Sequence, residues 1–267
     1  MYSFIERSLV GIVYAAVWII TLLYSPSVGY PILVFVIAIV AAFEMLKLYQ
    51  IRSLALTTLL TFGTVSLLCF NVQLTQIAIL SCIFQIVLAY LLFRRKSIKS
   101  HRLLASLLCI VHLLIPLLLI SEVSFVGSPV FTTELSFGLL FFIWGADATA
   151  YSFGTLFGKT PLFRVVSPKK SIEGAVAAIL FSPVIALVNQ QIFPNYAFSF
   201  WLLMGVIISI TSIVGDLVQS QCKRTAGVKD SGTILLGHGG VYDRIDSLIF
   251  TVPFVYLYIL LFNYYVS

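Results

Sequence analysis

The sequence has 267 residues, of which 60% are hydrophobic and only 10% are charged. Soluble domains carry about 25% charged residues, so this composition excludes a soluble enzyme, a disordered chain and a secreted disulfide scaffold. The formal net charge of +6 does not indicate nucleic-acid binding, because membrane proteins collect Lys and Arg on one side for topological reasons. We therefore expect an integral membrane protein with no nucleic-acid partner.

Apolar runs long enough to cross about 30 Å of hydrocarbon recur along the chain. In chain order they cover 8–24, 29–46, 53–70, 74–93, 103–120, 135–152, 172–189, 197–218 and 247–266. They predict an all-α, polytopic integral membrane bundle of about nine transmembrane helices. We divide it into a structural, lipid-facing part, 1–130, and a catalytic part, 131–267, with cytoplasmic loops at 153–171 and 219–246.

The charged residues give this topology a direction. All 16 Lys and Arg residues fall on one side of the nine predicted crossings, and the positive-inside rule makes that side cytoplasmic. The N-terminus is then expected in the cytoplasm and the C-terminus outside. All acidic residues except Glu122 and Glu134 lie near the cytoplasmic side as well. A simple membrane anchor does not need such carboxylates, so we expect the activity at the cytoplasmic surface.

Three residues of the N-terminal part interrupt its apolar runs. We interpret Glu44, near the end of the second run, as snorkelling to the surface or pairing with Lys47. We expect His112 to be hydrogen-bonded inside the bundle and Pro116 to bend the same helix.

A first polar stretch follows the sixth apolar run. Lys169 and Lys170 stand immediately before the seventh run, whose positive helix end would point to the same place and suit an anion. The alternative is that these lysines only mark the cytoplasmic side. Four glycines of this region would let the backbone approach a ligand closely: Gly145, Gly154, Gly158 and Gly174.

A second polar stretch joins the last two apolar runs and is richer in carboxylates. Asp216 and Ser220 share a helix face one turn apart, and Asp243 and Asp246 project together if their segment is helical. Four cations accompany them: Lys223, Arg224, Lys229 and Arg244. Carboxylates beside cations suit a divalent metal that shares phosphate ligands. The alternative is salt bridging among these same residues.

The stretch 220–246 resembles the signature of the phosphatidate cytidylyltransferases, also called CDP-diacylglycerol synthases. The residues in register are Ser220, Lys223, Arg224, Lys229, Asp230, Gly232, Leu235, His238, Gly239, Gly240, Val241, Asp243, Arg244, Ile245 and Asp246. The first polar stretch is also similar to this family, through Asp147 and the segments 150–159 and 167–174. Cys222 and Leu236 depart from the signature, without loss of an expected metal or phosphate ligand.

The resemblance implies transfer of the cytidylyl group of CTP to phosphatidate with Mg²⁺ as cofactor, and it leaves a second metal ion open. The implied metal ligands are Asp216, Asp243 and Asp246. The implied catalytic set adds Lys223, Arg224 and Arg244 to these. The implied substrate-binding residues are Asp147, Lys170, Glu173, Ser220, Lys229, His238, Gly239 and Gly240.

The remaining expectations concern surroundings and rival functions. Membrane lipid surrounds the protein, a homodimer is left open, and a bacterial plasma membrane with a cytoplasmic active site is the expected location. One alternative is a CTP-dependent polyprenol- or phytol-type lipid kinase, which would transfer the γ-phosphoryl group instead. A second is a transporter, whose intramembrane acids would carry ions or protons.

Overall fold

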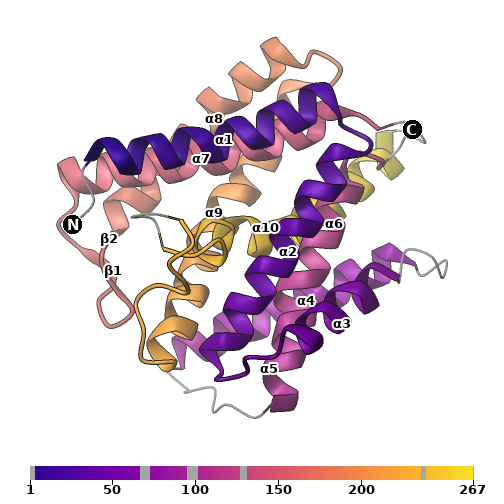
Figure 1. Ribbon diagram of the computed structural model, residues 1–267. Coiled ribbons are helices and arrows are strands. Elements are labelled where there is room, and N and C mark those ends of the chain that lie inside the picture. The colour runs from indigo at the N-terminus through magenta and orange to yellow at the C-terminus, as the bar shows by residue number, and fades with distance from the viewer. Residues whose placement is uncertain (1–3, 67–72, 95–101, 127–130, 236–238, 267) are drawn as a thin grey trace.

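The computed structural model describes residues 4–66, 73–94, 102–126, 131–235 and 239–266. It is a bundle of helices with one short hairpin at its edge (Figure 1). In chain order the elements are α1 (Phe4–Tyr24), α2 (Gly29–Leu48), α3 (Leu54–Val65), α4 (Leu74–Phe93), α5 (Arg102–Leu108), the π-helix η2 (Cys109–Leu114), α6 (Ile115–Val123), α7 (Thr133–Phe157), β1 (Pro161–Phe163), β2 (Ser167–Ser171), α8 (Ile172–Ile192), α9 (Phe198–Thr225), the 3₁₀ turn η3 (Tyr242–Arg244) and α10 (Asp246–Val266).

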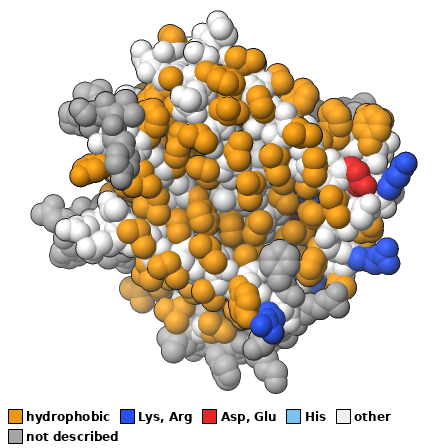
Figure 2. Space-filling model, turned by 180° about the vertical axis from the view of Figure 1, so that it is seen from behind, with side chains coloured by type: hydrophobic (Ala, Val, Ile, Leu, Met, Phe, Trp, Pro, Cys, Tyr) orange, Lys and Arg blue, Asp and Glu red, His pale blue; other side chains and the backbone are white. Residues whose placement is uncertain are grey.

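The helices have the length and composition of a membrane bundle. Within the described residues, six are long and apolar enough to cross a bilayer: Gly29–Leu48, Leu74–Leu91, Leu104–Val123, Ile172–Ile192, Phe198–Thr225 and Asp246–Tyr264. Two shorter apolar helices are Leu9–Tyr24 and Leu54–Val65. The face drawn in Figure 2 is covered by apolar side chains, with charges only near its margins. This surface suits lipid rather than water, which supports the predicted all-α membrane class.

Helices α7, α8 and α9 pack against one another, and α10 packs against α9, α4 and α6. The antiparallel pair β1–β2 connects α7 to α8. A Cβ on Gly174 would lie 2.5 Å from the Ala150 carbonyl oxygen and 3.1 Å from the Gly154 Cα. These two glycines therefore let α7 and α8 approach closely, whereas the sequence analysis had assigned them to close approach of a ligand.

Both helices that lead into the predicted loops extend beyond their apolar runs. α7 continues to Phe157 and α9 to Thr225, so parts of 153–171 and 219–246 are helical. The polar residues at the end of α9 are compatible with a helix, which ends just before Gly227, in the left-handed region at φ +75°. The hairpin was not predicted, because its strands are too short for a recognisable alternation.

The π-helix is stabilised from α4. Pro116 has no N–H to donate to the preceding turn, so carbonyl groups there need other donors. Ser81 Oγ donates to the Val111 carbonyl over 3.2 Å, and Gln85 Nε2 donates to the His112 carbonyl over 3.4 Å. His112 Nδ1 lies 2.7 Å from Gln85 Oε1. The expectation that His112 is hydrogen-bonded inside the bundle is thus confirmed.

The same glutamine also reaches α10. Pro253 lies inside that helix and cannot donate to the Ile249 carbonyl one turn earlier. Gln85 Nε2 donates to this carbonyl over 3.2 Å. The side-chain amide of Gln85 therefore donates to two carbonyl groups that prolines leave without a backbone donor. It links α4 to η2 and to α10.

Candidate active site

A cavity of about 680 Å³ lies where α7, β2, α9 and the start of α10 meet. Its charged lining residues are Asp147, Lys169, Lys170, Asp216, Lys223, Asp230, Asp243, Arg244 and Asp246. A smaller cavity of about 270 Å³, between α2, α3 and α6, is lined mainly by apolar side chains and has Glu122 as its one charged lining residue. Only the larger cavity has the mixed charges that a phosphate-bearing substrate and a cation need.

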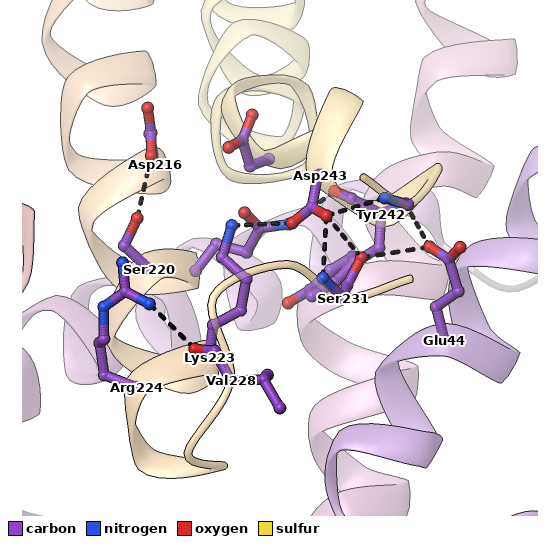
Figure 3. Close-up of polar contacts among 12 residues, drawn as sticks. Glu44, Asp216, Ser220, Lys223, Arg224, Val228, Ser231, Tyr242 and Asp243 are labelled. Carbon is purple, nitrogen blue, oxygen red and sulfur yellow. Dashed lines mark hydrogen bonds and ion pairs between the residues drawn. The ribbon is translucent and has the colours of Figure 1, made fainter. Parts of the chain in front are cut away.

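Three carboxylates that line this larger cavity come from three helices: Asp147 from α7, Asp216 from α9 and Asp246 from α10. Asp216, on α9, forms an ion pair with Lys170 of β2. It also accepts a hydrogen bond of 3.2 Å from Ser220 (Figure 3). The predicted shared face of Asp216 and Ser220 is therefore confirmed. Asp246, at the first position of α10, accepts the neighbouring amide of Ser247 over 2.8 Å. The negative charges of Asp147 and Asp216 both repel the Asp246 carboxylate. These carboxylates keep acceptor capacity for a ligand.

Asp243 differs, because protein donors surround it. Its Oδ1 accepts the Lys223 ammonium over 2.7 Å. Its Oδ2 accepts the Ser231 amide (2.8 Å), the Ser231 hydroxyl (3.0 Å) and the Gly240 amide (2.9 Å). Burial alone would raise the pKa of Asp243, but the hydrogen bonds from Lys223, Gly240 and Ser231 hold that pKa below its usual value. Asp243 is thus an ionised anchor of its loop.

The reason for the different surroundings of Asp243 and Asp246 is local geometry. Asp243 belongs to the 3₁₀ turn η3, Ile245 has a non-helical backbone, and α10 begins only at Asp246. The expectation that the two carboxylates project together required a continuous helix. Both line the cavity, but they have different hydrogen-bond partners.

Glu44 reaches this loop from α2, and its interpretation as a surface residue was wrong. Its side chain is buried, with 3% of the residue exposed. Its Oε2 accepts the Tyr242 amide over 2.9 Å and lies 3.2 Å from the Ser231 hydroxyl oxygen, whose one proton is shared between Glu44 and Asp243 (Figure 3). A carboxylate inside an apolar run was the signal that could have identified this role, because such groups are costly to bury without a partner.

The other predicted site residues fall into two groups. Lys170, Lys223 and Arg244 line the cavity. Arg224 instead donates to the Val228 carbonyl over 2.9 Å, and Lys229 is exposed; neither lines the cavity.

Glu173 also lies away from the cavity lining, because its carboxylate accepts the Thr160 amide at 3.1 and 3.2 Å. Gly239, with φ +85°, and Gly240 form the loop around Asp243. His238 lies outside the described residues.

A divalent cation in this cavity would need oxygen ligands that the protein leaves available. Within the described ranges, no three His, Cys, Asp or Glu side chains form a ready-made metal cage. Mg²⁺ does not need one, since it commonly takes one or two carboxylates and completes its shell with water and substrate phosphates. Asp216 and Asp246, whose charges repel, supply hard oxygen ligands of this kind. The residues therefore fit Mg²⁺, and the saturated Asp243 fits it less well than predicted.

The chain is similar to known cytidylyltransferases. The model of a family described as "Cytidylyltransferase family" matches residues 5–262. The chain is 46% identical over 113 residues to a protein named phosphatidate cytidylyltransferase from Staphylococcus saprophyticus, and 44% identical over 113 residues to one of that name from Staphylococcus aureus. Each alignment covers 42% of this chain and 43% of the relative. The chain thus spans less than half the length of these curated relatives in the match.

Proposed function

The chain belongs to the cytidylyltransferase family, and we propose that it transfers the cytidylyl group of CTP to phosphatidate, giving CDP-diacylglycerol and pyrophosphate. The observation that carries this proposal is the cavity in which Asp147, Asp216 and Asp246 meet Lys170, Lys223 and Arg244. Two polyanionic substrates must be brought together in this reaction, and clustered cations offset their repulsion.

The location of the cavity fits a lipid substrate. We propose nine crossings, with the N-terminus in the cytoplasm, the C-terminus outside and the cavity at the cytoplasmic side of a bacterial plasma membrane. The one-sided distribution of all 16 Lys and Arg residues supports this orientation. Phosphatidate would keep its acyl chains in the leaflet, while CTP would arrive from the cytosol.

For the metal, we propose that Asp216 and Asp246 hold Mg²⁺, with Asp147 close by. When bound, Mg²⁺ would polarise phosphoryl oxygens and stabilise the charge that develops on them. Asp243, which the sequence analysis placed in the same set, is retained as the partner of Lys223 instead. This change follows from its four protein donors.

The protein's own groups would act by positioning and charge. Lys170, Lys223 and Arg244 face the cavity and would bind the triphosphate of CTP and the lipid phosphate. Arg224 and Lys229 lie beyond the lining, where they would meet CTP at the rim. A phosphate oxygen of phosphatidate would attack the α-phosphorus of CTP, and the bond from that phosphorus to the bridging oxygen of pyrophosphate would break. The nucleophile is already an anion, so no strong general base is needed.

The experiment uses purified protein, phosphatidate vesicles and CTP labelled at either the α- or the γ-phosphate. Cytidylyl transfer places the α-label in lipid and the γ-label in released pyrophosphate, and chelation of Mg²⁺ stops both. A lipid kinase would place the γ-label in lipid when a polyprenol is supplied. No lipid-bound α-label in the presence of Mg²⁺ would refute the proposed function.

A further inference from the structure

The described parts of the loop between α9 and α10, 226–235 and 239–245, contact a carboxylate of α2, which comes from the other half of the chain. Tyr242 is fully buried, and its backbone is held from two sides. Its amide donates to Glu44 of α2 over 2.9 Å, and its carbonyl accepts Gln219 of α9 over 2.6 Å. The turn that carries Asp243 and Arg244 is therefore hydrogen-bonded, through Tyr242, to both α2 and α9.

Ser231 extends this contact to the cavity side. Its hydroxyl oxygen lies 3.2 Å from Glu44 Oε2 and 3.0 Å from Asp243 Oδ2. Asp243 in turn accepts Lys223, which lines the cavity. A continuous series of contacts thus connects Glu44, Ser231, Asp243 and Lys223 (Figure 3).

Two glycines of the loop lie so close to the Glu44 carboxylate that a larger residue would not fit there. A Cβ on Gly232 would overlap Glu44 Oε1, and its next nearest neighbours, at 2.8 and 3.3 Å, also belong to Glu44. A Cβ on Gly240 would overlap Glu44 Oε2 and the Ser231 hydroxyl oxygen. The loop accordingly closes around the Glu44 side chain, and small residues are required where it does so.

We propose that Glu44 is a positioning residue: by holding Tyr242 and Ser231 it fixes the turn η3 that carries Arg244, and through Asp243 of the same turn it fixes Lys223 of α9, so that both cations are presented to the substrates. This inference rests on the proposed function, because it assigns those two cations to CTP. Glu44 does not line the cavity and does not touch the reacting atoms. Asp246 belongs to α10, which packs on α4, α6 and α9. Loosening the loop therefore weakens CTP binding more than it slows the chemical step.

The test compares steady-state kinetics of purified variants with varied CTP and saturating phosphatidate. Glu44→Leu leaves the Tyr242 amide without its acceptor, and its KM for CTP rises about tenfold while kcat stays within about threefold. Glu44→Gln keeps an oxygen acceptor and restores KM to within about threefold of the original protein. Met45→Ala is the matched control, because Met45 is the next residue of α2 and is 1% exposed; it lowers the melting temperature and leaves KM unchanged.

A second comparison keeps the inference testable if Glu44→Leu does not fold. Gly232→Ala places a methyl group against Glu44 and raises KM for CTP, whereas in a Glu44→Ala background it causes no further rise. The inference is overturned if the active original protein and the Glu44→Leu variant share one KM, or if the Gly232→Ala effect is the same in both backgrounds. An original protein that transfers no α-label to lipid refutes the proposed function instead, which separates the two failures.

Discussion

Asp243 and Asp246 are three residues apart and line the same cavity, yet their surroundings are opposite. Asp243 accepts four hydrogen bonds from Lys223, Ser231 and Gly240. Asp246 accepts the amide of its neighbour Ser247 and is repelled by Asp147 and Asp216. One carboxylate is satisfied by protein donors, whereas the other lies near two further carboxylates, with Lys170 as a nearby positive charge.

The difference separates a carboxylate that stabilises the fold from one that is available for the reaction. A buried carboxylate whose acceptor sites are filled stabilises the fold, and its removal leaves a buried cation unpaired. A carboxylate kept near other carboxylates costs stability, which a bound cation recovers. We therefore expect loss of Asp246 to affect mainly activity and loss of Asp243 to affect mainly the stability of the fold.

The largest effect is expected on the cavity side. Asp246→Asn removes a proposed metal ligand, and kcat should fall on the order of 10³-fold, equivalent to about 4 kcal/mol. Because the substitution also removes a repelled charge, the melting temperature in detergent should be unchanged or higher. A marked loss of thermal stability with little loss of turnover would reverse the assignment.

On the loop side, Asp243→Ala should destabilise the protein by about 3–5 kcal/mol, since it leaves Lys223 unpaired with only 10% of its side chain exposed. The double variant Asp243→Ala/Lys223→Met should recover much of this stability but not the activity. Thermal unfolding followed by intrinsic fluorescence measures both. If the double variant is as unstable as the single one, the ion pair is not the reason for the destabilisation.

In the apolar bundle, Gln85 resembles Asp243, because its side-chain amide is also hydrogen-bonded within the protein. Gln85→Leu leaves the carbonyls of His112 and Ile249 without their donor, and we expect a loss of about 2 kcal/mol with normal KM values. Adding Pro253→Ala supplies a helical amide to Ile249 and should restore part of the loss. Equal stability of the single and double variants would count against this explanation.

The smallest effect is a pH dependence of stability. The folded-state pKa of Asp243 is lowered by its donors, with burial opposing them, so its contribution is present above the unfolded pKa of about 3.9 and is lost as pH falls through the folded value. Melting temperatures recorded between pH 6 and pH 3 should decline more steeply for the original protein than for Asp243→Asn. Parallel curves would show that Asp243 contributes nothing to this decline.

Much of this arrangement follows from local sequence rules. The apolar runs predicted where helices lie, and helical periodicity placed Ser220 beside Asp216. Glu44 could not be placed in the same way, because its contact with Tyr242 joins positions 198 residues apart. The direction of Asp243 depends on a 3₁₀ turn that ends before α10, and no pattern in the sequence distinguishes that turn from a continuous helix. Long-range packing and turn geometry thus decided which of the cavity carboxylates is satisfied by protein donors and which keeps acceptor sites for a ligand.

Asp246, and not Asp243, is the proposed ligand of the metal. Mn²⁺ serves as the probe, and its binding to the purified original protein, Asp246→Asn and Asp243→Asn is followed by electron paramagnetic resonance after size-exclusion chromatography has selected folded protein. We expect Mn²⁺ affinity to fall at least about tenfold in Asp246→Asn and to stay within about twofold in Asp243→Asn. Loss of Mn²⁺ binding in Asp243→Asn, with normal binding in Asp246→Asn, would contradict the account.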